Sequence, residues 1–274
     1  MINTNDKLGW LWWILLFIVS TYNTHNIFDF YFKTEMSTFQ KKITVFSIVY
    51  TIVCAVRAFF PKKDLARICF FDSRLSYSLF GRTIATIAEL SYIKLLVLIL
   101  GEIIKDINNI TPISSSIPYL IEFIFPIIVI AQSCSWTGSI TKNNIWNAIE
   151  ESIWMVSFAI LTIICIILYL KISNISNLKV DKIKNLLLIA IISGLLFVTF
   201  MYKVDVPMYL KRWHNNKEKS LGFWEGIIDM GQCTKVTKSY EVWKSEIPWQ
   251  TGYFTFAVWS SILLVKWFNE YSKL

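Results

Sequence analysis

The chain has 274 residues, of which 55% are hydrophobic and 17% charged, with a formal net charge of +8 and a mean hydropathy of +0.50. A soluble domain carries about 25% charged residues, so long apolar runs have replaced charge here, as is typical of an integral membrane protein. Basic residues are spread over several connections, and no extramembrane region is long enough to present a basic face. We therefore expect the lipid bilayer as a partner and no nucleic acid.

Seven segments approach the length of about 17 to 25 apolar residues that crosses a bilayer as a helix. They cover residues 8–25, 43–60, 79–100, 117–136, 150–170, 185–202 and 251–268. These runs predict an all-α fold, a polytopic integral membrane helical bundle of seven transmembrane helices in a single domain, 1–274. The first segment contains several tryptophans, which suit the interfacial belt of a retained helix better than a cleaved signal peptide.

The longest connection, residues 203–249, lies between the sixth and seventh segments. Within it, Leu221, Trp224, Ile227 and Ile228 share one face of a helix, which predicts an amphipathic helix lying in the headgroup region. Such a connection either caps the mouth of the bundle or anchors the chain at the membrane surface. Its tryptophans favour the anchor.

The cysteines and histidines do not predict a metal or disulfide site. The five cysteines are scattered and form no CxxC pair, which is typical of small buried side chains and predicts neither a disulfide framework nor a zinc site. They are Cys54, Cys69, Cys134, Cys165 and Cys233. The two histidines, His25 and His214, are too far apart in sequence for a metal-binding motif. No metal site is expected, and the cofactor, if any, is unknown.

The basic residues and the glycosylation sequons disagree on membrane orientation. The start of the chain and the even-numbered connections hold 14 Lys and Arg against 9 for the other side, but 6 against 9 once the 203–249 connection is removed. The positive-inside rule weights short connections most. Sequons at Asn109 and Asn174 both fall on the odd side, which favours a cytoplasmic start of the chain in a host that glycosylates. The compartment is not indicated.

Glu89 is the eleventh residue of the third segment, near its middle. An ionisable carboxyl is expensive in hydrocarbon, so it faces a protein interior, a partner or a water-filled cavity. Helical geometry places Arg82, Thr86 and Glu89 on one face. Glu89 is therefore either a proton carrier or general base, or a structural group neutralised by Arg82, Lys94 or the backbone.

Three arginines are candidate substrate-binding residues at the membrane edge: Arg57 near the end of the second segment, Arg74 in the next connection, and Arg82. The planar guanidinium fork matches phosphate and carboxylate groups, although basic residues beside a membrane also contact anionic lipid without specificity. Near the start of the fifth segment, Glu151 is suited to the positive end of the helix dipole. It is also a candidate catalytic acid–base group together with Glu89.

Three classes of function fit these residues. The first is a membrane-embedded enzyme or binding protein for a lipid-like or isoprenoid substrate, with the apolar tail between helices and the polar head at the arginines. The alternative is a proton-coupled transporter in which Glu89 titrates, or a structural subunit whose charges pair with membrane protein partners. Many transporters show internal repeats and broken helices at the midplane. Pro126 is the one candidate break among the central segments and no repeat is visible, which favours the first class.

Overall fold

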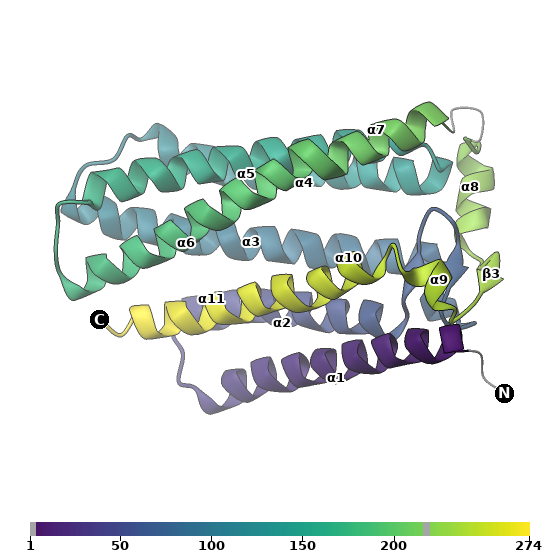
Figure 1. Ribbon diagram of the computed structural model, residues 1–274. Coiled ribbons are helices and arrows are strands. Elements are labelled where there is room, and N and C mark those ends of the chain that lie inside the picture. The colour runs from purple at the N-terminus through teal and green to yellow at the C-terminus, as the bar shows by residue number, and fades with distance from the viewer. Residues whose placement is uncertain (1–3, 216–219) are drawn as a thin grey trace. The chain divides into compact units, whose positions relative to one another are not determined.

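The computed structural model describes residues 4–215 and 220–274 and is built mostly of helices (Figure 1). The chain divides into two compact units. Unit 1 comprises Met1–Leu95 and Gly222–Asn269, and unit 2 comprises Leu96–Leu221 and Glu270–Leu274. The single transmembrane domain expected from the sequence stays a prediction.

Unit 1 is a group of long helices closed at one end by smaller elements. Its helices are α1 (Thr4–Lys33), α2 (Thr38–Phe59), the first part of α3 (Ser78–Ile110), α10 (Ile247–Gly252), the π-helical turn η4 (Tyr253–Ala257) and most of α11 (Val258–Tyr271). A short link joins α1 to α2, and Ser37 starts α2 with a capping box in which its side chain and that of Gln40 bond each other's backbone. The two helices therefore pack as an antiparallel pair (Figure 1).

Side-chain hydrogen bonds fix α11 against the other helices of unit 1. Ser261 Oγ donates to Ser47 Oγ (2.8 Å), Trp259 Nε1 to Asn23 Oδ1 (2.9 Å) and Lys266 Nζ to Asn26 Oδ1 (2.6 Å). These bonds join α11 to α1 and α2. In a membrane such interhelical bonds contribute about 0.6 kcal/mol each, so together they set the register of the helices.

A compact cap, defined as residues 60–77 and 222–246, closes one end of unit 1. It contains β1 (Lys62–Lys63), β2 (Ile68–Cys69), the 3-10 turn η1 (Arg74–Ser76), α8 (Phe223–Met230), β3 (Lys235–Val236) and α9 (Tyr240–Trp243). The strands form a sheet in the order β1-β2-β3, antiparallel between β1 and β2 and parallel between β2 and β3. This sheet joins two parts of the chain that are far apart in sequence.

A disulfide between Cys69 and Cys233 links the two halves of the cap, with their Cα atoms 5.9 Å apart. The expectation that no cysteines pair is therefore wrong. The partners are 164 residues apart, and only the β2–β3 pairing brings them together. Of the remaining three, Cys54 and Cys165 are buried as expected and Cys134 is partly exposed.

Aromatic side chains form the core of the cap. Trp243 is fully buried, lies 5.6 Å from Phe70 and 5.8 Å from Trp12 between ring centroids, and donates Nε1 to Thr237 O. By contrast, Trp224 on α8 is 75% exposed. The 203–249 connection was interpreted mainly as an interfacial anchor. In the structure its second half packs as a cap, and α8 keeps an exposed apolar face.

Unit 2 is built from the rest of α3 and the helices that follow. They are α4 (Ser116–Thr141), α5 (Asn144–Ile172), α6 (Leu178–Phe200), the π-helical turn η2 (Met201–Asp205) and α7 (Val206–Asn215). Lys142 takes a left-handed conformation (φ 55°) in the tight turn between α4 and α5, and the Asn143 side chain caps α5. α5 packs against α4, α6 and α7.

Two helix ends differ from the boundaries expected from hydropathy. The predicted connection beginning at residue 203 is helical to Asn215, because η2 carries the backbone from α6 into α7 without a break. Likewise α3 continues past residue 100 through a polar stretch to Ile110. Glu89 is therefore the twelfth of the 33 residues of this helix and lies before its middle.

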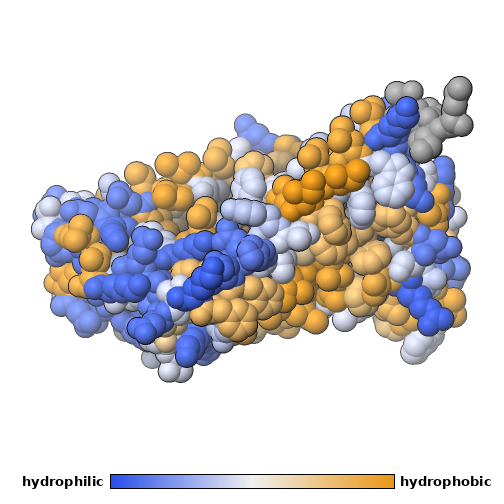
Figure 2. Space-filling view, turned by 90° about the horizontal axis from the view of Figure 1, so that it is seen from below, coloured by the Kyte–Doolittle hydropathy of each residue, from blue (hydrophilic) through white to orange (hydrophobic). Residues whose placement is uncertain are grey.

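Five helices in the described part of the chain are long and apolar enough to cross a membrane. They are Thr38–Phe59, Ser78–Ile110, Ser116–Thr141, Asn144–Ile172 and Leu178–Asn215. The count of seven is not confirmed, because α1 and the α10–α11 run are not among them. α1 nevertheless exposes apolar side chains along its first half: Leu8, Leu11, Ile14, Leu15, Phe17 and Ile18. In Figure 2 apolar surface (orange) gathers in the middle of the view, and hydrophilic surface (blue) lies toward its two ends.

Candidate functional site

An ion pair on α3 is the centre of the candidate site. Arg82 Nη2 lies 3.2 Å from Glu89 Oε2, and the two side chains are only 11% and 15% exposed. Two helical turns separate the residues, so both project from the same face, as the sequence predicted. Tyr253 on η4 donates its hydroxyl to the other carboxylate oxygen, Oε1, at 3.3 Å. The carboxylate of Glu89 is thus held from two helices.

Arg57 lies in the last turn of α2 and stacks on the same aromatic pair of η4. Its guanidinium carbon is 5.2 Å from the ring centroid of Tyr253 and 5.4 Å from that of Phe254, a distance at which a cation is attracted to the ring face. Its Nη1 is shielded from solvent and has no hydrogen-bond partner among the described residues. An ionised donor left in this state is costly, so this nitrogen is suited to receive an anion.

Lys62 and Asp64 bring two further charges from the cap. Lys62 Nζ donates to Tyr77 O at 2.9 Å and lies 3.8 Å from Asp64 Oδ1. Burial lowers the pKa of Lys62 to about 8. Burial alone would raise the pKa of Asp64, but the positive charges of Lys62, Arg57 and Arg82 outweigh it and the pKa is lowered. Asp64 is therefore a fixed negative charge.

We call Arg57, Lys62, Asp64, Arg82, Glu89 and Tyr253 the polar cluster. All belong to unit 1, and their charged groups lie within electrostatic range of one another. With Lys62 protonated, three cations face two carboxylates, which leaves one positive charge in excess. The nearby Arg67–Asp229 ion pair (2.7 Å) is neutral and does not change this balance. The cluster is thus arranged to attract a singly charged anion.

The other candidate residues lie outside the polar cluster. Arg74 is on η1 in the cap and is exposed. Glu151 belongs to unit 2, where Tyr209 of α7 lies within electrostatic range of it and of the buried residues Glu150 and Asp205. The structure thus brings together Arg57, Arg82 and Glu89, and the roles of Arg74 and Glu151 stay predictions.

Three members of the polar cluster were not identified from the sequence. Lys62 and Asp64 lie in a charged connection, and Tyr253 lies in an apolar segment. Their signal is weak, because each becomes part of the site only when the cap folds onto the ends of the helices. Gly81 shows how closely the cap packs on α3, because a Cβ at this position would lie 1.2 Å from Lys62 Nζ.

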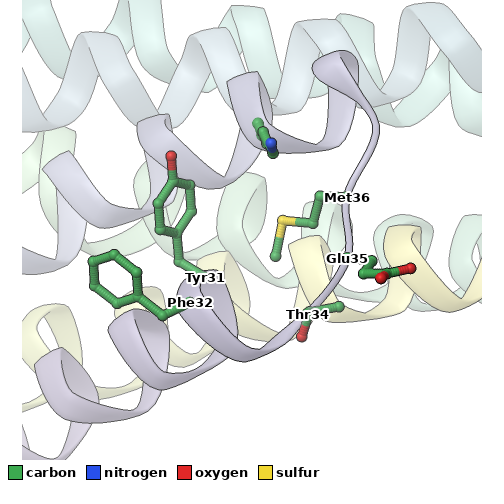
Figure 3. Close-up of a pocket in the computed structure, with 6 residues that line it drawn as sticks. Tyr31, Phe32, Thr34, Glu35 and Met36 are labelled. Atoms are coloured by element: carbon green, nitrogen blue, oxygen red, sulfur yellow. The ribbon is translucent and has the colours of Figure 1, made fainter.

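Two hollows elsewhere in unit 1 are separate from the polar cluster. One, of about 390 Å³, lies at the α1–α2 link and is lined by Tyr31, Phe32, Thr34, Glu35, Met36 and Lys41 (Figure 3). Lys41 is sixteen residues before Arg57 on the same helix, or about 24 Å along its axis. A second, apolar groove of about 480 Å³ runs between α1 and α2. Its α2 residues, Ile52, Ala55, Val56 and Phe59, form a face of the helix different from that of Arg57.

Comparison with known proteins identifies no relative. No protein-family model, no curated protein and no solved structure matches the chain. The assignment of function therefore depends on the chemistry of the polar cluster.

Proposed function

We propose that the chain is an integral membrane protein, an enzyme or binding protein, that takes a lipid-like or isoprenoid molecule with an anionic head. Five apolar helices support the membrane location, and the polar cluster supports the anionic head. The single observation that carries the proposal is the Arg57 guanidinium, whose Nη1 is shielded and without a hydrogen-bond partner among the described residues. Binding an anion there supplies the missing acceptor and neutralises the excess charge.

The two arginines of the polar cluster have different roles in this proposal. Arg82 is paired with Glu89 and so holds the carboxylate in place. Arg57 keeps donors for the ligand and is itself oriented by the rings of Tyr253 and Phe254. A phosphate or carboxylate bound to Arg57 would lie beside Tyr253, whose hydroxyl contacts Glu89. In an enzyme, Glu89 would orient the Tyr253 hydroxyl beside the ligand while it keeps its ion pair with Arg82.

The geometry favours this reading over a proton carrier. Protonating Glu89 would remove the 3.2 Å ion pair with Arg82, and breaking a buried pair is strongly unfavourable. A transporter that cycles a proton through Glu89 would meet this penalty in every turnover. The structural-subunit alternative explains the Arg82–Glu89 pair but gives no role to the Arg57 donor within this chain.

The proposal is tested by native mass spectrometry of the protein released gently from its own membrane. We expect the wild type to retain a small molecule of defined mass that carries an anionic group. Arg57→Gln should lose it. Arg212→Gln is the matched control, since Arg212 also lies over a tyrosine ring (5.6 Å from the Tyr209 centroid) but is exposed on α7. That variant should keep the ligand.

A second variant separates loss of the ligand from loss of the fold. Arg57→Lys keeps the charge but not the planar fork of donors, and we expect at least tenfold lower occupancy with the Cys69–Cys233 disulfide still formed. A wild-type chain that carries no ligand, or equal retention in Arg57→Gln and Arg212→Gln, would overturn the proposal.

A further inference from the structure

The Cys69–Cys233 disulfide carries information about the two sides of the membrane. Disulfides persist in oxidising compartments and are rare where thioredoxin and glutathione keep thiols reduced. This one joins two cap segments 164 residues apart. We infer that the capped end of unit 1 faces an oxidising compartment, and that the opposite ends of its helices face the reducing side.

Several helix ends meet at the cap, so the inference fixes their direction. The start of α1 packs on the cap: a Cβ on Gly9 would lie 1.8 Å from Lys238 O. The end of α2 and the start of α3 flank its first half directly, since α2 ends at Phe59 and α3 begins at Ser78. The chain therefore enters α1 from the oxidising side, the reverse of the orientation favoured by the sequons.

The same direction places both sequons on the reducing side. α3 leaves the cap and crosses once, so Asn109 near its end lies on the far side of the membrane. α4 and α5 then cross twice, which returns the chain to that side at Asn174. We expect neither asparagine to be glycosylated. The basic residues of the short connections agree, because 9 lie on the side assigned as reducing and 6 on the other.

The orientation also says from which side a ligand reaches the polar cluster, a consequence that rests on the proposed function. Arg57 lies two residues before the end of α2 and Arg82 four residues after the start of α3. At 1.5 Å per residue, both are within about 6 Å of the capped ends along the helix axis. The anionic head therefore comes from the oxidising side, in solution or in that leaflet.

The test compares two lysines in matched surroundings. Lys244 in the cap and Lys105 near the end of α3 are exposed, and each pairs with a glutamate three residues earlier, at 2.6 and 3.0 Å. Lys244→Cys and Lys105→Cys are expressed in a bacterial inner membrane, and spheroplasts are treated with a membrane-impermeant maleimide. We expect label on Lys244→Cys at once and on Lys105→Cys only after permeabilisation, against the wild-type background.

Opposite or equal labelling of the two variants would overturn the inference. If a variant stays unlabelled even after permeabilisation, a second experiment on the wild type tests the orientation. Thiols are blocked in intact cells, and the peptides are then analysed without reduction. A linked Cys69–Cys233 peptide is expected, and alkylated thiols at both positions would refute the orientation. Because neither readout needs a ligand, failure here is distinguishable from failure of the proposed function.

Discussion

Removing one partner of the Arg82–Glu89 pair should destabilise the protein by several kilocalories. Both side chains are at least 85% buried and their charged atoms are 3.2 Å apart, and breaking such a pair costs about 3–5 kcal/mol because it leaves an unpaired buried charge. Tyr253 still bonds an amide at position 89, so we place Glu89→Gln at the lower end, about 3 kcal/mol. Arg82→Gln should destabilise the Glu89→Gln variant less than it destabilises the wild type, with a coupling energy of about 2 kcal/mol.

The assay is reversible unfolding of the purified protein in mixed micelles, followed by tryptophan fluorescence, for the wild type and both single and double variants. A matched control lies on the same helix. The Glu102–Lys105 pair is also close, at 3.0 Å, but its side chains are 35% and 73% exposed, so Glu102→Gln should cost less than about 1 kcal/mol. If Glu89→Gln were no more destabilising than Glu102→Gln, or if the double variant were additive, Arg82 and Glu89 would not form the pair on which the site depends.

Three further predictions concern the cap. Gly9→Ala should weaken docking of α1, because the added Cβ would lie 1.8 Å from the backbone oxygen of Lys238. Gly101→Ala is the control, since a Cβ there meets nothing within 4 Å and should stabilise the helix by up to about 1 kcal/mol. Thermal unfolding compares the two variants. Because the pKa of Lys62 falls from 10.5 to about 8 on folding, the unfolded chain binds more protons between these values, and stability should rise across that range; Lys62→Met should flatten the profile. Cys69→Ser should lower stability by at most about 5 kcal/mol, and reductant should not lower it further.

The sequence predicts the helical class and the main charged pair because both depend on local spacing. Apolar runs of sufficient length identify the long helices, and the interval of seven residues places Arg82 and Glu89 on one face. Their contact at 3.2 Å confirms that geometry. Helix ends are less well predicted, since a backbone such as that from Met201 to Asn215 stays helical through polar residues once it packs against a neighbouring helix.

The cap and the rest of the site could not be predicted, because they depend on long-range pairing. Cys233 meets Cys69 only after β3 pairs with β2, and two-residue strands have no detectable periodicity. Tyr253 joins Glu89 across 164 residues. A single sequence shows which residues can carry charge in a membrane. It does not show which of them come together in one cluster, because that depends on long-range contacts.

We propose that Arg57 holds an anionic ligand that the chain itself does not supply. An electron cryomicroscopy map of the protein, extracted with its native lipid in nanodiscs, tests this. We expect non-protein density within hydrogen-bond distance of Arg57 Nη1, continuous with an apolar tail between helices. A carboxylate of the protein seated on that nitrogen, or water alone, would contradict it.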